Sequence, residues 1–224
     1  SELPMHCDRQ AALAQLNLSP EPFYVAMMPG SRAAEVAQIG PVLLAAMAQL
    51  RILRPNMAFI LPMANEKRAE TFRAMLKGFD TKRDSQQALT PHVHIHIDCS
   101  QAALAASHAV VVASGTATLE AMLMKKPMVV VYKWGQLTHQ IISRMKKVEW
   151  VSLPNLLAEE ALVPELIQEA CTSENIVASL MEQLQPDVEA KLIKRFNAYH
   201  QLLNKNADHL AAAFVYQLIE SRRA

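Results

Sequence analysis

The chain has 224 residues, of which 51% are apolar and 19% are charged, and its formal net charge is +1. This composition excludes an intrinsically disordered chain. Because acidic and basic residues nearly balance, the chain has no basic field that would attract nucleic acid. Cys7, Cys99 and Cys171 are too few and too far apart for a disulfide framework or a metal signature, so we expect a reducing, cytoplasmic setting. Neither a signal peptide nor a stretch of about 20 apolar residues is evident, and we expect no membrane span.

The first 21 residues predict a helix, and a Ser-Pro-Glu-Pro linker at 19–22 closes a connecting segment of residues 1–22. A chain that starts on such a connector is expected to begin partway through a larger protein. Short β-type runs and helical patterns then alternate. The predicted strands are Phe23–Met28, Ala58–Leu61, Val93–Ile97, Ala109–Ala113 and Met128–Tyr132. The predicted helices are Ala33–Leu53, Asn65–Lys77, Ser100–Ala106 and Thr116–Met124.

Two of these runs, AVVVA at 109–113 and MVVVY at 128–132, are continuously apolar rather than alternating. Strands that helices cover on both faces have this pattern, which is typical of a parallel sheet. The series of strand, helix and strand therefore predicts an α/β fold. We expect a doubly wound, Rossmann-like parallel sheet within a domain of residues 23–163.

The strand signal fades after the fifth run. Gln136–Lys147 is a basic, amphipathic helix pattern, which fits either a helix packed on the core or one that lies at an anionic membrane surface. We expect one more short strand at 149–153 and only helix from Pro164 onward. Pro186 would separate the helical segments, and Asp208–Arg222 would be the last helix.

The C-terminal segment, residues 164–224, is thus predicted to be helical and to pack on the sheet domain or on a partner. Its helices carry apolar stripes, which could support a homodimer where no other surface covers them. One stripe is formed by Leu192, Phe196, Tyr199 and Leu203.

Glycine is scarce, with 5 residues in the chain against about 16 expected from average usage. Gly30 and Gly115 each follow a predicted strand and precede a predicted helix. Glycine at such a junction permits a tight turn and a close approach of the backbone to a ligand, and the amides that open the helix favour an anion. In open α/β sheets ligands bind at this edge, so both loops are candidate binding loops.

The first loop reads Pro29-Gly30-Ser31-Arg32. The hydroxyl of Ser31 can cap the helix or donate to a phosphate oxygen, and Arg32 offers a planar, permanently charged fork for phosphate. An ordinary capped turn with a solvated arginine would have the same sequence. The spacing alone leaves both readings open.

The second loop combines small hydroxyl residues with a glycine, which suits a diphosphate. Glu120, five residues past the glycine, could accept hydrogen bonds from ribose hydroxyls; a capping box with this glutamate facing water is the alternative. Neither loop matches a Walker or dinucleotide-binding fingerprint. The loop residues are Ser114, Gly115, Thr116, Ala117 and Thr118.

His92, His94 and His96 alternate at the third predicted strand and so fall on one face. Side chains that neighbour each other on one strand diverge too much to form a three-histidine metal site easily. We interpret them as a solvated strand face and expect no metal.

Several motifs together resemble lipid-A-disaccharide synthase. They are PGSRAAEV at 29–36, ASGTATLEAML at 113–123, KKPMVVVY at 125–132, VSLPNLLA at 151–158 and LVPELIQ at 162–168. The resemblance is ordered and runs from about Met28 to the C-terminus. The SGTATLE segment alone would indicate only a glycosyltransferase of the GT-B fold.

The resemblance implies the C-terminal, donor-binding half of a GT-B enzyme that is peripheral to the inner membrane of Gram-negative bacteria. The donor would be UDP-2,3-diacylglucosamine, the acceptor 2,3-diacylglucosamine 1-phosphate (lipid X), and the products a β-1,6 disaccharide and UDP, with no metal or cofactor. Carried onto this chain, Arg32 and the Gly115–Thr116 amides would hold the diphosphate and Glu120 the ribose. Asn155 would be a further functional polar residue, with Tyr132 and Lys133 nearby.

The match covers only the C-terminal part of the family. The N-terminal half would supply most of the acceptor site and an aspartate as general base, so we expect this chain alone to be weakly active or inactive. Two alternatives stay open: an enzyme similar to UDP-N-acetylglucosamine 2-epimerase, and a non-catalytic subunit that pairs with a separate N-terminal half.

Overall fold

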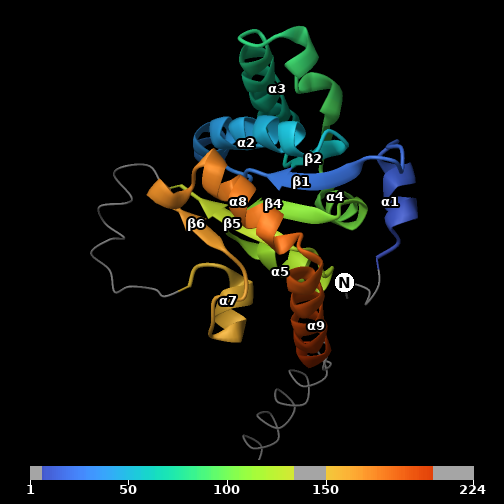
Figure 1. Cartoon of the computed structure of the whole chain (residues 1–224), viewed down its shortest axis with the longest axis vertical. Coiled ribbons are helices and arrows are strands. Elements are labelled where there is room, and N and C mark those ends of the chain that lie inside the picture. The colour runs from blue at the N-terminus through green and yellow to red at the C-terminus, as the bar shows by residue number, and fades with distance from the viewer. Residues whose placement is uncertain (1–6, 134–149, 204–224) are drawn as a thin grey trace, which may run out of the picture.

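The computed structural model of the chain describes residues 7–133 and 150–203, which form a parallel sheet between two layers of helices (Figure 1). The sheet has six strands in the order β3-β2-β1-β4-β5-β6, the order of a doubly wound fold. The strands are β1 (Phe23–Met28), β2 (Met57–Met63), β3 (Val93–Ile97), β4 (Ala109–Ala113), β5 (Met128–Tyr132) and β6 (Glu165–Ile167). The predicted α/β class and the five strands predicted between residues 23 and 132 are confirmed.

Helices cover both faces of the sheet. One face carries α2 (Ala33–Leu53), α3 (Glu66–Asp80) and α8 (Ser173–Gln183). The other carries α1 (Arg9–Gln15), α4 (Ser100–Ala106), α5 (Thr116–Leu123) and α9 (Pro186–Leu203). The remaining helical pieces are α7 (Leu153–Ala158) and the 3-10 turns η1 (Ser85–Gln87), η2 (Thr90–His92) and η3 (Gln168–Ala170).

Strand β1 shows why the central strands are apolar on both sides. Val25 and Met27 point into the core under α2, whereas Tyr24, Ala26 and Met28 point into the cores under α1 and α5. All five are buried because alternate side chains leave opposite faces of a strand and each face has its own layer of helices. A strand in this position has no face exposed to solvent, so its sequence does not alternate between apolar and polar residues.

The helix α2 is the central helix of one layer. By length and apolar composition it could cross a membrane, which corrects the expectation that no stretch qualifies. Half of its most apolar window is buried inside the protein, however, as is typical of a core helix. Its core face includes Val36, Ile39, Leu43, Met47 and Leu50, none of them exposed.

The region after β5 departs from the prediction in two places. Residues 150–152 form no strand, and α7 begins at Leu153. After Pro164 the chain is not helical throughout, because β6 pairs with β5 in parallel and extends the sheet. The boundary predicted at 163 stays a prediction, and the helices predicted at 136–147 and 208–222 lie outside the described residues.

The apolar stripe of α9 is largely covered by the chain itself. Leu192 and Phe196 are buried in the core formed with α5, and Tyr199 packs against the same core. Leu192 and Phe196 are therefore not available to a second subunit, whereas Leu203 is 39% exposed, and dimerisation through the C-terminal helices stays a prediction.

Candidate functional site

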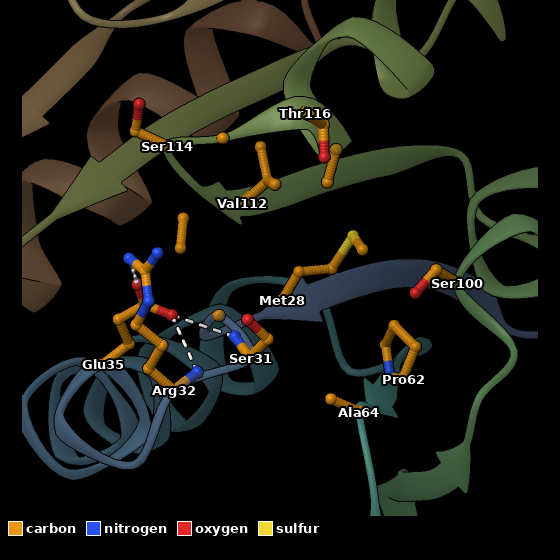
Figure 2. A pocket seen from close by; sticks show the side chains of 14 residues that line it. Met28, Ser31, Arg32, Glu35, Pro62, Ala64, Ser100, Val112, Ser114 and Thr116 are labelled. Carbon is orange, nitrogen blue, oxygen red and sulfur yellow. Dashed lines mark hydrogen bonds and ion pairs between the residues drawn. The ribbon is translucent and has the colours of Figure 1, made fainter.

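A pocket of about 410 Å³ opens at the carboxyl edge of the sheet, between the loops that follow β1 and β4 (Figure 2). The strand order diverges between these two strands, and such a switch point is where doubly wound sheets bind ligands. Its lining is formed by Met28, Gly30, Ser31, Arg32, Glu35, Pro62, Ala64, Ser100, Val112, Ala113, Ser114, Gly115, Thr116 and Ala117. The structure thus brings the two predicted glycine loops together.

Glu35, in the first turn of α2, folds back over the first loop. One carboxylate oxygen accepts hydrogen bonds from the amides of Ser31 (2.9 Å) and Arg32 (3.0 Å). Gly30 makes room for it: φ at this residue is +103°, and a Cβ there would lie 2.3 Å from the same oxygen. The amides of Ser31 and Arg32 are therefore satisfied within the protein.

Arg32 is the group that the first loop leaves available to a ligand. Its side chain is 77% exposed and lines the pocket, and one guanidinium nitrogen lies 3.2 Å from the second carboxylate oxygen of Glu35. A guanidinium has five N–H donors, so this ion pair leaves donors that can bind phosphate oxygens.

The second loop presents free amides. Gly115 is the N-cap of α5, with φ +157° and ψ −166°, a region that residues with a Cβ rarely adopt. Thr116 and Ala117 open the helix, where backbone amides have no intrahelical partner. Within residues 7–133 and 150–203 no acceptor is bonded to these two amides. Both residues line the pocket, and free amides at the N-terminus of a helix favour an anion.

Ser114 connects this loop to the segment before α7. Its hydroxyl donates to the Val151 carbonyl (2.9 Å). The carboxylate of Glu165, the first residue of β6, accepts hydrogen bonds from the amides of Val151 (3.0 Å) and Ser152 (2.9 Å). The second loop is thus held in place by the edge strand of the sheet.

Asn155 belongs to the same network and does not line the pocket. Its side chain is fully buried, donates to the Val163 carbonyl and to Glu165 (both 2.9 Å), and accepts from the Val163 amide (2.8 Å). Both N–H groups and the carbonyl oxygen of this side chain thus have partners inside the fold. The structure gives it a positioning role rather than a ligand contact.

The other predicted site residues also lie outside the pocket lining. Thr118 is buried and its hydroxyl donates to the Gly115 carbonyl (2.7 Å), so it shapes the turn. Glu120 is partly buried farther along α5, and Tyr132 and Lys133 lie at the end of β5.

Sequence reasoning missed part of the lining. Pro62 and Ala64 come from the end of β2, and Ser100 opens α4. These residues form no motif; only the pairing of β2 with β1, and of β3 with β2, could have pointed to them. Glu35 stood in the first motif without a role assigned to it.

The three histidines are half-buried rather than solvated. His92 Nε2 lies 2.8 Å from Arg51 Nη2, and the ring of His94 meets Tyr24 edge-on at 5.9 Å. Burial lowers the pKa of His92, His94 and His96. Across the described parts of the chain, no three or more His, Cys, Asp or Glu side chains are grouped as metal ligands would be.

Solved structures share the fold at low sequence identity. The C-terminal CMP-Kdo binding domain of WaaA from Acinetobacter baumannii is 15% identical, with a TM-score of 0.54 over 88% of this chain and 96% of that one. The lipopolysaccharide glycosyltransferase WaaG is 12% identical, with a TM-score of 0.57 over 86% of this chain and 46% of that one. A UDP-N-acetylglucosamine 2-epimerase described as putative, from Listeria monocytogenes, also shares the fold (TM-score 0.52, 17% identity, 82% of this chain and 42% of that one).

Sequence comparison is more specific. Lipid-A-disaccharide synthase of Pseudomonas aeruginosa (strain UCBPP-PA14) is 42% identical over 98% of this chain and 55% of the relative. The synthase of Hahella chejuensis is 37% identical over 99% and 54%. The chain therefore spans about half the length of the curated relatives it matches. The sequence model of the lipid-A-disaccharide synthetase family matches residues 2–215, and the chain belongs to this family.

Proposed function

We propose that this chain is the donor-binding part of a lipid-A-disaccharide synthase. The reaction would transfer 2,3-diacylglucosamine from its UDP donor to lipid X, form the β-1,6 disaccharide of lipid A and release UDP. The acyl chains of both substrates would keep it at the cytoplasmic surface of the inner membrane. Since the chain spans about half of its relatives, we expect little or no transfer by this part alone.

The observation that carries the proposal is the pairing of free amides with a guanidinium in one pocket. The amides of Thr116 and Ala117 and the side chain of Arg32 line the same 410 Å³ pocket. Helix N-termini and arginine both favour phosphate groups. A diphosphate between them would have partners from both loops.

The same groups would assist the reaction. UDP departs with a negative charge that develops as the sugar leaves, and fixed donors aimed at that charge lower the barrier. The acceptor hydroxyl must also be held in line with the anomeric carbon. Among the described residues of the lining, Glu35 is the one carboxylate, and it is already bonded to the first loop, so a base for that hydroxyl would come from the rest of the enzyme.

The structural neighbours support this choice of ligand. HepE of Anabaena, solved with UDP and glucose, shares the fold with a TM-score of 0.58 over 88% of this chain and 49% of that one, at 16% identity. The WaaA domain is described as a CMP-Kdo binding domain and has nearly the same extent as this chain. A nucleotide-sugar site on an isolated domain of this size is thus a reasonable expectation.

Titration calorimetry with UDP, without added metal ion, tests the proposal. We expect saturable binding by the wild type and at least tenfold weaker binding by Arg32→Ala, because a charged hydrogen bond contributes about 1.5–3 kcal/mol. Arg54→Ala is the matched control, since Arg54 follows α2 at the opposite end from the pocket. Equal losses in both variants would contradict the proposal, and so would a failure of UDP to bind at millimolar concentration both to the wild type and to a Glu35→Gln variant.

A further inference from the structure

The carboxylate of Glu35 already occupies an anion position at the pocket. It accepts hydrogen bonds from two amides of the first loop and from one guanidinium nitrogen of Arg32. A phosphate group binds to the same kind of donors. We infer that Glu35 sets the affinity of the pocket for a diphosphate by competing with the ligand for Arg32. This inference rests on the proposed donor site.

The geometry shows that the carboxylate is held in place. Only 11% of the Glu35 side chain is exposed, against 77% for Arg32. The absence of a side chain at Gly30 leaves the space in which the carboxylate sits. Glu35 is thus fixed on the fold, while the guanidinium of Arg32 is free to exchange one partner for another.

The charges of the lining lead to the same conclusion. Among the described residues that line the pocket, only Arg32 and Glu35 carry a formal charge, and their charges cancel. A diphosphate would gain the attraction of Arg32 but would also meet the repulsion of Glu35. Its net attraction would then come mainly from the amides that open α5.

This arrangement would act chiefly on the product. Free UDP carries a terminal phosphate and therefore about one more negative charge near pH 7 than a UDP-sugar, because the second pKa of a terminal phosphate is about 6. A fixed carboxylate beside Arg32 would weaken the binding of UDP more than that of the donor. Glu35 would therefore favour release of UDP after transfer.

Glu35→Gln removes the negative charge but keeps an oxygen that can accept the hydrogen bonds from the amides of Ser31 and Arg32. Glutamine at the third position of a helix can still accept hydrogen bonds from the loop amides, so the variant should fold. We expect UDP to bind about three- to tenfold more tightly, the factor for one charge about 6 Å away at an effective dielectric constant of about 40–80. The gain should shrink as salt is added, and it should be smaller for UDP-N-acetylglucosamine than for UDP.

The Arg32→Ala background separates competition from other effects. There Glu35 can still repel the diphosphate but can no longer compete for the guanidinium, so the gain from Glu35→Gln should be smaller than in the wild type by the share that is due to competition. Glu66→Gln is the matched control, because Glu66 also stands in the first turn of a helix, α3, but lies outside the pocket lining. It should leave UDP affinity unchanged.

The UDP affinities of the wild type and of Glu35→Gln together decide between the possible results. UDP binding by the wild type that is unchanged or weaker in Glu35→Gln overturns the inference and leaves the donor site standing. Binding by Glu35→Gln alone supports the inference and shows the carboxylate to be the obstacle. Absence of binding by both proteins overturns the proposed donor site and the inference with it.

Discussion

The buried network around Asn155 makes a sharp prediction about stability. Its Nδ2 donates to the Val163 carbonyl and to Glu165 Oε1, both at 2.9 Å, in a side chain that is fully buried. Asn155→Asp keeps the size of the side chain but turns this donor into an acceptor that faces two acceptors. We expect the free energy of unfolding to fall, and to fall more at pH 7 than at pH 5.

Two effects compete to set the size of this loss. Two ionised carboxylates about 3 Å apart repel each other by about 5 kcal/mol at an effective dielectric constant of about 20. Taking up a proton at pH 7 instead costs about 4 kcal/mol, from an ordinary pKa of about 3.9 and about 1.36 kcal/mol per unit. Protonation is therefore the cheaper outcome, and the new hydroxyl can donate to Glu165.

The pH dependence follows from that proton. With one lost hydrogen bond of about 1 kcal/mol to the Val163 carbonyl, the total loss is about 5 kcal/mol at pH 7. At pH 5 the proton costs only about 1.5 kcal/mol, so the loss shrinks to about 2.5 kcal/mol. The introduced carboxyl has a raised pKa in the folded state, so the folded protein binds more protons and stability falls as pH rises.

Urea denaturation at both pH values, followed by circular dichroism, measures these losses. Asn155→Ala should lose about 2–3 kcal/mol at either pH, because it leaves buried partners unpaired without adding a charge. Asn175→Asp is the control, since the Asn175 amide donates to the Ala170 carbonyl (2.9 Å) at an exposed site. A loss in Asn155→Asp that is equal at pH 7 and pH 5, or no larger than in Asn175→Asp, would refute the reasoning.

Two further predictions concern stability. Gly30→Ala should cost about 3 kcal/mol in urea denaturation, since a Cβ at positive φ costs about 1 kcal/mol and displacing Glu35 breaks two hydrogen bonds of about 1 kcal/mol each. His108 stacks on Phe23 with ring centroids 4.2 Å apart, and burial lowers its pKa to about 4. The neutral ring of His108 should contribute about 1–2 kcal/mol to the free energy of unfolding, after allowing for its partial exposure. This contribution is present above pH 6.5 and is lost as pH falls toward 4. His108→Gln should make the free energy of unfolding depend less on pH between 4 and 6.5. An unchanged pH dependence would contradict this role of His108.

The sheet was predictable because burial on both faces leaves a clear mark. Runs such as AVVVA at 109–113 have no other common use in a chain with this alternation of elements. The edge strand β6 has no such mark: its three residues are Glu165, Leu166 and Ile167, each partly exposed. It forms because the β5 edge offers partners, which depends on the fold and not on local sequence.

The roles of polar residues were harder to predict than their presence. Asn155 bonds to residues 163 and 165, and Ser114 bonds to Val151, so their partners lie 8 to 37 positions away. The sequence alone does not distinguish a buried asparagine that holds a loop from an exposed asparagine that binds a ligand. Only the tertiary structure separates them.

The two glycine loops carry the same spacing and use it differently. Glu35 follows Gly30 by five residues, and Glu120 follows Gly115 by five. The helix α2 begins at residue 33, so Glu35 stands in its first turn and closes back on the loop. The helix α5 begins at residue 116, directly after its glycine, which places the second glutamate beyond the first turn and leaves the opening amides uncovered. A shift of two residues in where a helix starts thus decides which loop is capped from within and which is open to an anion.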